Sequence, residues 1–406
     1  MSGGRHATGA AGPGRPQVML NAAARAQVPG ASRAREPLAV HRRLPGYAPT
    51  PLASCPEIAA ELGVRAVWAK DETWRLGLPA FKMLGASYAT YRALTERLGH
   101  EVTWAGVDDL RTELAALGPM ALAAATDGNH GRAVARMARL LGLSAAIYVP
   151  EGTVAARIRA IESEGAAVSV VAGDYDAAVR RSAQDASDTC LVVSDTSWPG
   201  YTRIPGWVVD GYSTIFAEVA DQLSAAGAGE PDLVVIPVGV GALAAAAVHH
   251  FKAGGLARTP FLLGVEPSSA SCVLASLRAG RLVTVPGPHP SIMVGLNCGT
   301  PSQIAWPLLA AGMDAMVAVD DDWARRAMRA LAAAGIVAGE TGAAGLGGLF
   351  AVCETDPGAL VRDACQLGPD TSVLLLCTEG ATDEAAWEQI VGRPVPGSAH
   401  PQPDLA

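Results

Sequence analysis

The chain has 406 residues, of which 50% are hydrophobic and only 5% aromatic. This length allows two domains, and the composition predicts a large core built from small side chains. A net charge of −8, with no basic stripe in the body of the chain, argues against nucleic acid as a main partner.

The two ends of the chain differ in composition from the rest. Residues 1–36 contain five arginines, many small residues and no acid before Glu36, and no apolar core of a secretory signal is present. We expect 1–36 and the proline-rich 396–406 to be disordered extensions, with an organelle transit peptide as the alternative for the first. The longest apolar stretch, residues 233–247, contains Pro237 and two glycines and does not suit a membrane span.

Lys82 is one of only three lysines, with Lys70 and Lys252, and it lies in the apolar run Leu78–Leu84. Arginine always stays protonated, whereas lysine can lose its proton and become a nucleophilic amine. A lysine inside a hydrophobic stretch is therefore a candidate Schiff-base residue. The alternative is a side chain that reaches solvent from the boundary of an element.

Residues 120–194 alternate between short apolar segments and segments with a helical pattern. We expect strands at Ala121–Ala125, Ala145–Val149, Ala167–Val171 and Leu191–Ser194. Helices are expected between them at Arg132–Leu141, Thr153–Glu164 and Tyr175–Ser187. Short apolar strands without polar alternation, separated by helices, predict a parallel sheet that is covered on both faces.

Two loops of this first series carry polar groups where strands end. Asp127-Gly-Asn-His-Gly131 lies between a strand and a helix, where backbone amides can bind a carboxylate. Asp127 is a candidate acid or base and Asn129 a candidate neutral donor, with a helix N-cap as the structural alternative for Asp127. Asp195 follows another strand and is expected to face the same cleft, with an Asx-turn as its alternative.

A second series of the same kind begins at residue 233. We expect strands at Leu233–Pro237, Phe261–Val265, Met316–Val319 and Ser372–Cys377, and helices at Ala242–Phe251 and Trp323–Ala334. The stretch Tyr201–Tyr212, with Pro205 and Gly206, is the expected boundary between two α/β units. A ligand is expected in the cleft between these units, at the carboxyl ends of the strands.

Gly239-Val-Gly-Ala-Leu-Ala244 follows a strand of the second series and opens a helix. Backbone amides at such a turn, together with the helix dipole, can hold a phosphate. The same residues also match the sequence motif of a dinucleotide-binding turn. In that interpretation Glu266, at the end of the next strand, would bind the ribose. A nicotinamide oxidoreductase therefore stays open, as does a tight turn that needs glycine only for packing.

Seven cysteines are scattered along the chain without the paired spacing of zinc sites, which argues against a zinc site. Cys272 and Cys298 flank one proline- and glycine-rich segment and could meet. We favour buried free thiols in a reducing cytoplasm, where disulfides are rare.

Two segments nearer the C-terminus complete the candidate site. Thr378 follows the strand Ser372–Cys377, so its hydroxyl can contact a ring edge at the floor of the cleft. Gly339-Glu-Thr-Gly342 precedes a helix and is either the cap of that helix or part of the site through Glu340.

Taken in this order, the motifs resemble those of the fold-type II pyridoxal phosphate enzymes, the family of tryptophan synthase β and threonine deaminase, and among these the diaminopropionate ammonia-lyases. Asp127 is the more specific sign, because most of the wider family has a small residue there. The resemblance covers residues 37–390. The segments that carry it are Lys70–Gly85, Thr126–Arg132, Asp195–Tyr201, Pro237–Ala242, Gly264–Pro267, Met293–Gly299, Gly339–Gly342 and Thr378–Asp383.

The resemblance implies an α/β fold with two three-layer αβα domains and mostly parallel sheets. The large cofactor-binding domain would comprise residues 37–88 and 201–395, and the small domain residues 89–200. The implied cofactor is pyridoxal 5′-phosphate and the implied partner a small amino-acid substrate, without nucleic acid or membrane. Related enzymes are commonly dimers, so we expect a cytoplasmic homodimer.

Roles follow for the matched positions. Lys82 would bind the cofactor as a Schiff base, Asn129 would contact its ring oxygen, and Thr378 would face its pyridine nitrogen. Because the last partner is a neutral hydroxyl, that nitrogen is expected to stay largely unprotonated. The remaining implied positions are Gly239, Val240, Gly241 and Ala242 at the phosphate, Glu340 near the cofactor, and Asp127 and Asp195 around the substrate.

The implied reaction is the α,β-elimination of 2,3-diaminopropionate to pyruvate and ammonia. Asp127 and Asp195 favour a substrate with an extra amine, which a carboxylate can bind. We also infer that Asp127 removes a proton from the opposite face of Cα, so that both enantiomers react. The alternatives are a serine/threonine dehydratase or β-replacement synthase of the same fold, a nicotinamide oxidoreductase, and an inactive relative that serves as a binding protein.

Overall fold

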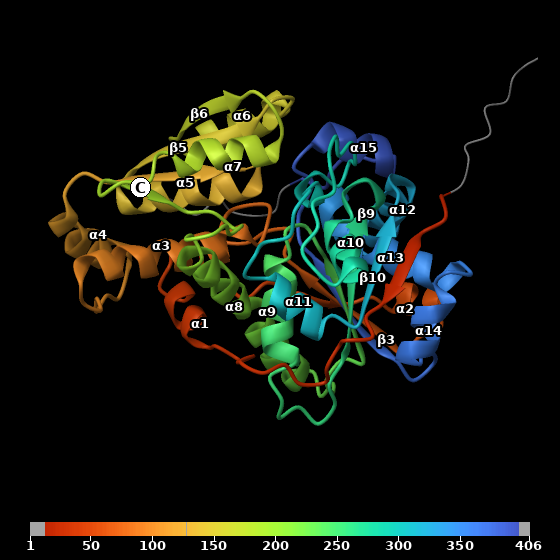
Figure 1. Cartoon of the computed structure of the whole chain (residues 1–406). Helices are drawn as coiled ribbons and strands as arrows, with labels where there is room; N and C mark the ends of the chain where they lie inside the picture. The colour runs from red at the N-terminus through yellow and green to blue at the C-terminus, as the bar shows by residue number, and fades with distance from the viewer. Residues whose placement is uncertain (1–12, 127, 398–406) are drawn as a thin grey trace, which may run out of the picture.

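The computed structural model describes residues 13–126 and 128–397. Its chain forms a smaller and a larger α/β unit that lie against each other (Figure 1). The strands are β1 (Gln17–Leu20), β2 (Leu52–Ser54), β3 (Ala66–Asp71), β4 (Ala121–Ala125), β5 (Ser144–Pro150), β6 (Ala167–Val171), β7 (Cys190–Val192), β8 (Leu233–Pro237), β9 (Phe261–Pro267), β10 (Ala315–Val319) and β11 (Ser372–Cys377).

These strands make two sheets. The larger sheet has the order β1-β10-β9-β8-β11-β3-β2, and the smaller sheet has the order β6-β5-β4-β7. Only the two edge strands of the larger sheet, β1 and β2, pair antiparallel with their neighbours, and every other pairing of named strands in the described residues is parallel. The mostly parallel α/β fold expected from the sequence is confirmed.

Helices cover both sheets. They are α1 (Glu36–His41), α2 (Pro56–Leu62), α3 (Lys82–Leu98), α4 (Val107–Leu114), α5 (Asn129–Leu141), α6 (Ala155–Glu162), α7 (Tyr175–Ala183), α8 (Arg203–Ala225), α9 (Ala242–Phe251), α10 (Cys272–Ala279), α11 (Trp306–Gly312), α12 (Asp321–Ala333), α13 (Glu340–Glu354), α14 (Ala359–Cys365) and α15 (Glu384–Val391). In the described part of the chain, none of them is long and apolar enough to cross a membrane.

The larger sheet separates two hydrophobic cores. Along β8, Val234 and Ile236 belong to the core that contains α3, α8 and α9, whereas Val235 belongs to the core that contains α12 and α13. Successive side chains of a strand point to opposite faces, so a strand buried at every position needs a helical layer on each side. This explains why β8 is apolar throughout.

The N-terminal segment is partly ordered, which corrects the expectation of a disordered extension through residue 36. Residues 17–20 form β1 and extend the larger sheet beside β10. The indole Nε1 of Trp323 donates to the carbonyl of Gly14 at 3.0 Å, and Arg33 donates to the carbonyl of His250 at 2.9 Å. Residues 1–12, and 398–406 of the expected C-terminal tail, lie outside the described residues.

The stretch Tyr201–Tyr212, expected as a boundary, is mostly helical. Helix α8 begins at Arg203 and continues to Ala225. Pro205 lies in its first turn, where the missing N–H of proline costs no helical hydrogen bond. Helix α8 packs closely against α3, the helix that begins at Lys82. Helix α8, which follows the smaller unit in the chain, therefore packs against the helix that carries Lys82 at its start.

Candidate functional site

A pocket of about 740 Å³, counting its open mouth, lies between the two units. It collects side chains from the starts of α3 and α5, from the ends of β7 and β11, and from the turn before α9. Strand ends and helix starts meet at this edge because the strands are parallel. Among the residues proposed from the sequence, those that line it are Lys82, Asn129, Asp195, Gly239, Val240, Gly241, Ala242 and Thr378.

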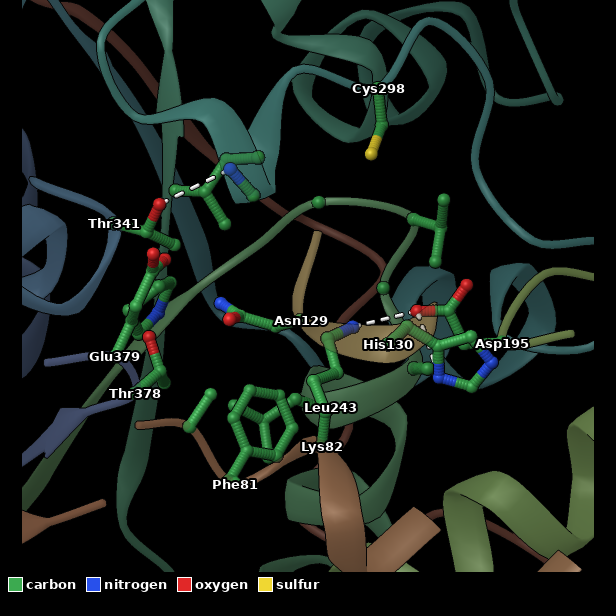
Figure 2. Close-up of a pocket in the computed structure, with 18 of the residues that line it drawn as sticks. Phe81, Lys82, Asn129, His130, Asp195, Leu243, Cys298, Thr341, Thr378 and Glu379 are labelled. Atoms are coloured by element: carbon green, nitrogen blue, oxygen red, sulfur yellow. Dashed lines mark hydrogen bonds and ion pairs between the residues drawn. The ribbon is translucent and has the colours of Figure 1, made fainter. Parts of the chain in front are cut away.

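Lys82 is distinguished from the other two lysines by its place in this pocket. Its Nζ lies 2.7 Å from Asp195 Oδ2, and its side chain is 21% exposed (Figure 2). Lys70 pairs with Glu218 and Lys252 with Asp314, both at 2.7 Å, and these two lysine side chains are at most 3% exposed. Lys70 and Lys252 are buried structural cations, whereas Lys82 can reach a ligand.

Asp195 is held as a carboxylate by its neighbours. Burial alone would raise its pKa, but the charge and the hydrogen bond of Lys82 outweigh burial and hold the pKa of Asp195 below its ordinary range. The hydroxyl of Tyr175 donates to Oδ1 of Asp195 at 3.2 Å. The carboxylate of Asp195 thus contacts two residues that line the pocket. These contacts differ from the Asx-turn that was its alternative role.

His130 stands beside this ion pair as a neutral imidazole. Its Nε2 lies 2.8 Å from the carbonyl oxygen of Val193, which can only accept, so Nε2 carries the proton. Burial disfavours the protonated ring and lowers the pKa of His130. Asp195 raises this pKa and Lys82 lowers it, each by less than burial does. Its Nδ1 is 4.0 Å from Asp195 Oδ2 and has no hydrogen-bond partner among the described residues.

The turn before α9 has the geometry of a phosphate site. Gly241 has φ +96°, a conformation that side chains rarely adopt, and α9 begins at the next residue. A Cβ atom at Gly239 would lie 3.1 Å from the carbonyl oxygen of Gly295 and 3.2 Å from Cys298 Sγ. Glycine at both positions leaves the backbone amides open toward the pocket, at the positive end of the helix dipole.

Glu266 does not serve the pocket, which removes the support for a dinucleotide site. It is fully buried and accepts hydrogen bonds from the backbone N–H groups of Val273 and Leu274 at 2.7 and 2.9 Å. It therefore caps the start of α10 and lies outside the described lining of the pocket. A carboxyl group without exposure cannot bind a ribose.

The buried Glu266 predicts a pH-dependent stability. Burial raises the pKa of Glu266 to about 8, well above the value near 4.3 in an unfolded chain. Its contribution to stability is complete below the unfolded pKa and is lost as pH rises through the folded pKa, at most about 1.4 kcal/mol per pH unit. Chemical denaturation between pH 5 and 8 should show a falling free energy of unfolding. The Glu266→Gln variant should have a shallower slope, and an equal slope would contradict this account.

Two other proposed residues are not placed in the pocket. Asp127 lies outside the described residues, so its role stays a prediction. Glu340 is the first residue of α13 and lies outside the described lining, whereas the next residue, Thr341, lines the pocket. The helix starts directly after Gly339, as the cap interpretation expected.

The sequence analysis missed Tyr175, Thr341 and Glu379, which also line the pocket. Tyr175 begins the helix that follows β6, and Glu379 directly follows Thr378, so a systematic search of strand ends would have found both. Thr341 Oγ1 accepts from the N–H of Gly295 at 3.2 Å.

All seven cysteines lie within the described residues, where no disulfide joins them, and Cys272 and Cys298 are both buried. Burial raises the pKa of Cys272 well above its ordinary value. Among the described residues, no group of three or more histidine, cysteine or acidic side chains could hold a metal ion.

The pocket fits pyridoxal phosphate. Thr378 Oγ1 is buried and has no hydrogen-bond partner among the described residues, which suits a ligand ring nitrogen. The open amides before α9 suit a phosphate, and Lys82 suits an aldehyde. The family model of pyridoxal-phosphate dependent enzymes matches residues 43–378, and the chain belongs to this family.

Relatives within the family are more specific. The chain is 36% identical to the diaminopropionate ammonia-lyase of Escherichia coli strain K12, over 86% of this chain and 89% of that protein. It is 34% identical to the Salmonella typhimurium enzyme of the same name, over 88% and 91%. A crystal structure of the E. coli enzyme in complex with D-serine superposes with a TM-score of 0.85 at 34% identity, covering 93% of this chain and 97% of that one.

Proposed function

We propose that this protein is a diaminopropionate ammonia-lyase, which converts 2,3-diaminopropionate to pyruvate and ammonia with pyridoxal 5′-phosphate as its cofactor. The observation that carries the proposal is the Lys82–Asp195 pair, at 2.7 Å, in a pocket that also contains a phosphate turn. The two relatives named above, at 34 and 36% identity over most of both chains, support the substrate.

Four elements of the pocket would hold the cofactor. Lys82 would bind it through Nζ, the turn Gly239–Ala242 would bind its phosphate, Asn129 its ring oxygen, and Thr378 the region of its pyridine nitrogen. When bound, the cofactor withdraws electrons from the substrate Cα and makes the Cα proton acidic. The protein then has to orient the substrate, exclude water and move that proton.

Lys82 is placed to move the proton. Once a substrate amine has replaced it, its free Nζ can accept the proton from Cα as a general base. The β-amine leaves as ammonia only if it gains a proton, because an amide anion is not a leaving group. The protonated Nζ of Lys82 can return the proton to this nitrogen. The released enamine then hydrolyses to pyruvate and a second ammonia.

Asp195 would select and position the substrate. Its buried carboxylate lies 2.7 Å from Lys82 Nζ, so it can hold an ammonium group in the same place. A substrate with a second amine can take up this interaction, whereas the hydroxyl of serine or threonine gives only a neutral hydrogen bond. The N–H groups at the start of α5, around Asn129, would bind the substrate carboxylate.

Asp127 supports a prediction about stereochemistry. If Asp127 takes the proton from the face of Cα opposite Lys82, Asp127→Asn should lower kcat for one enantiomer of diaminopropionate by about 10²-fold or more. Turnover of the other enantiomer should change far less. Separate assays with the D- and L-substrate measure both values, and an equal loss for both would refute this role.

The second candidate is a serine/threonine dehydratase. A biosynthetic L-threonine dehydratase of Mycobacterium tuberculosis is 30% identical over 87% of this chain and 73% of that protein. The identity and the covered share of the relative's own length are both lower than for the E. coli diaminopropionate ammonia-lyase, and a neutral hydroxyl gives the Asp195 carboxylate no cation to bind.

The test is a comparison of kcat/KM for three substrates. Purified holoenzyme should release pyruvate from 2,3-diaminopropionate with a kcat/KM at least about tenfold above that for serine or threonine, the scale of one hydrogen bond to a charged group. A preference for serine or threonine would favour the dehydratase.

We further propose a cytoplasmic homodimer. Seven cysteines that form no disulfide among the described residues support a reducing compartment. The dimer rests on the resemblance to related enzymes and is checked by light scattering during size-exclusion chromatography.

A further inference from the structure

The imidazole of His130 is held in place through one of its two nitrogens. Helix α5 begins at Asn129, so His130 lies in its first turn, and its Nε2–H donates to the carbonyl of Val193 at 2.8 Å. Val193 directly follows β7, and its own N–H donates to the carbonyl of Ala123 in the neighbouring strand β4 at 2.8 Å. The carbonyl that orients the ring is therefore fixed by the smaller sheet.

This contact leaves Nδ1 of His130 as an unprotonated acceptor in the pocket. A neutral imidazole carries one proton, and the Val193 carbonyl, which can only accept, places that proton on Nε2. Nδ1 has no hydrogen-bond partner among the described residues. The residue lines the pocket and is only 2% exposed, so its ring is sheltered from bulk water. A buried acceptor without a donor is costly, and a ligand N–H would remove that cost.

The carboxylate of Asp195 lies next to this acceptor. Nδ1 is 4.0 Å from Asp195 Oδ2, so the two atoms do not share a hydrogen bond (Figure 2). A nitrogen at about 2.9 Å from each atom can donate to both across a gap of this width. The Nζ of Lys82 contacts the same Oδ2 at 2.7 Å without a hydrogen bond to Nδ1. Since a carboxylate oxygen has two lone pairs, a second cation can bind Oδ2 on the side of His130.

We propose that His130 is a binding residue for the second amine of the substrate, whose ammonium group donates to His130 Nδ1 and to Asp195 Oδ2 together. The proposal rests on the proposed function for the class of substrate, a 2,3-diamino acid. An ammonium group has three N–H bonds, so one group can satisfy both acceptors at once. The Nε2–H of His130 takes no part, because Val193 engages it.

The number of donors explains how this pair of acceptors would distinguish substrates. The side-chain hydroxyl of serine or threonine has a single O–H. It can donate to Asp195 or to His130 but not to both, which leaves one buried acceptor unpaired. A site that is built to receive N–H groups rejects an analogue without them, because its buried polar groups then lack partners. His130 would thus add to the charge of Asp195 in favouring an amine over a hydroxyl.

Two variants of His130 separate the roles of its two ring nitrogens. In His130→Gln the side-chain amide can reach the place of Nε2 and donate to Val193, but no acceptor remains near the place of Nδ1. In His130→Asn the shorter side chain brings an amide oxygen near the place of Nδ1 and loses the contact with Val193. We expect the preference for a diamino acid to be lost in His130→Gln and largely kept in His130→Asn. A purely structural role of the ring predicts the opposite order.

The binding measurement uses ligands without a leaving group on Cβ. Holoenzyme is titrated with 2,4-diaminobutyrate and with 2-aminobutyrate, which lacks the second amine, and the visible absorption of the cofactor reports binding. Wild-type enzyme should bind the diamino acid more tightly. His130→Gln should reduce that preference by about tenfold or more, the scale of one hydrogen bond to a charged group. The ratio of kcat/KM for 2,3-diaminopropionate to that for serine should fall by a similar factor.

His250→Gln is the matched control. His250 is a buried imidazole that packs against Phe216 and Phe251, outside the described lining of the pocket. Its replacement should leave both ratios unchanged.

An unchanged preference in a folded His130→Gln enzyme would overturn the proposal, and so would an equal or greater loss in His130→Asn. Wild-type enzyme that binds both ligands equally well would overturn it whether or not the variants fold. In each of these cases, pyruvate release from diaminopropionate by the wild-type enzyme would leave the proposed function intact. A holoenzyme that prefers the diamino ligand through His130 but releases no pyruvate would refute the proposed function alone.

Discussion

The Lys82→Ala enzyme should lose elimination activity by more than about 10³-fold, the scale of a lost general base alone. The variant loses both the amine that holds the cofactor and the base that accepts the Cα proton. Borohydride treatment should label wild-type Lys82 with the cofactor, as peptide mass spectrometry would show, and should label no lysine of the variant. Fold stability should fall, because the buried Asp195 carboxylate loses its ammonium partner, and thermal unfolding followed by circular dichroism would verify that the variant is still folded at the assay temperature.

Lys252→Arg is the matched control for this variant. Lys252 forms an equally short ion pair, 2.7 Å from Asp314, but lies outside the described pocket lining. Its replacement should preserve both activity and the labelling of Lys82. Covalent labelling that persists at another lysine of the Lys82→Ala enzyme would show that Lys82 is not the cofactor-binding residue.

The Asp195→Asn enzyme should have a kcat lower by about 10²-fold on diaminopropionate, since the neutral amide cannot hold an ammonium group at Lys82 Nζ. The loss of kcat with serine as the substrate should be smaller, because serine has no second ammonium group. Steady-state kinetics on both substrates measures the difference. An equal loss on both would show that Asp195 positions Lys82 and does not select the substrate.

Acid titration separates the Asp195 effect from general instability. The pKa of Asp195 is held below its ordinary value near 3.9, so the Lys82–Asp195 attraction is complete above about pH 4 and is lost only in more acidic solution. The stability of the cofactor-free enzyme therefore should not change between pH 5 and 9 through Asp195. Asp314→Asn, which breaks the remote Lys252–Asp314 pair, should lower stability without the substrate-dependent loss of kcat.

Most of the parallel strands could be predicted from the sequence, whereas β1, β2 and β3 of the larger sheet could not. The buried strands β4, β8 and β11 have the predicted bounds, because buried parallel strands are short apolar runs, and the edge strand β6 has its predicted bounds as well. Strand β3 contains Lys70 in a fully buried position, which an apolar pattern cannot anticipate. Its charge is neutralised by Glu218, far away on α8, and only the tertiary structure reveals that partner.

Much of the pocket was likewise predictable, because most of its groups follow the ends of predicted strands. The Lys82–Asp195 pair joins residues 113 positions apart, and the sequence placed both at one cleft without showing their contact. Glu379 directly follows Thr378 and could have been found by the same search of strand ends.

The most direct measurement is the stoichiometry of products from 2,3-diaminopropionate with the purified holoenzyme. Loss of the β-amine followed by hydrolysis of the enamine predicts two molecules of ammonia for each pyruvate, without oxidation of the substrate. Lys82→Ala should form neither product. Absence of pyruvate with the wild-type holoenzyme, or a single ammonia for each pyruvate, would contradict the proposed elimination.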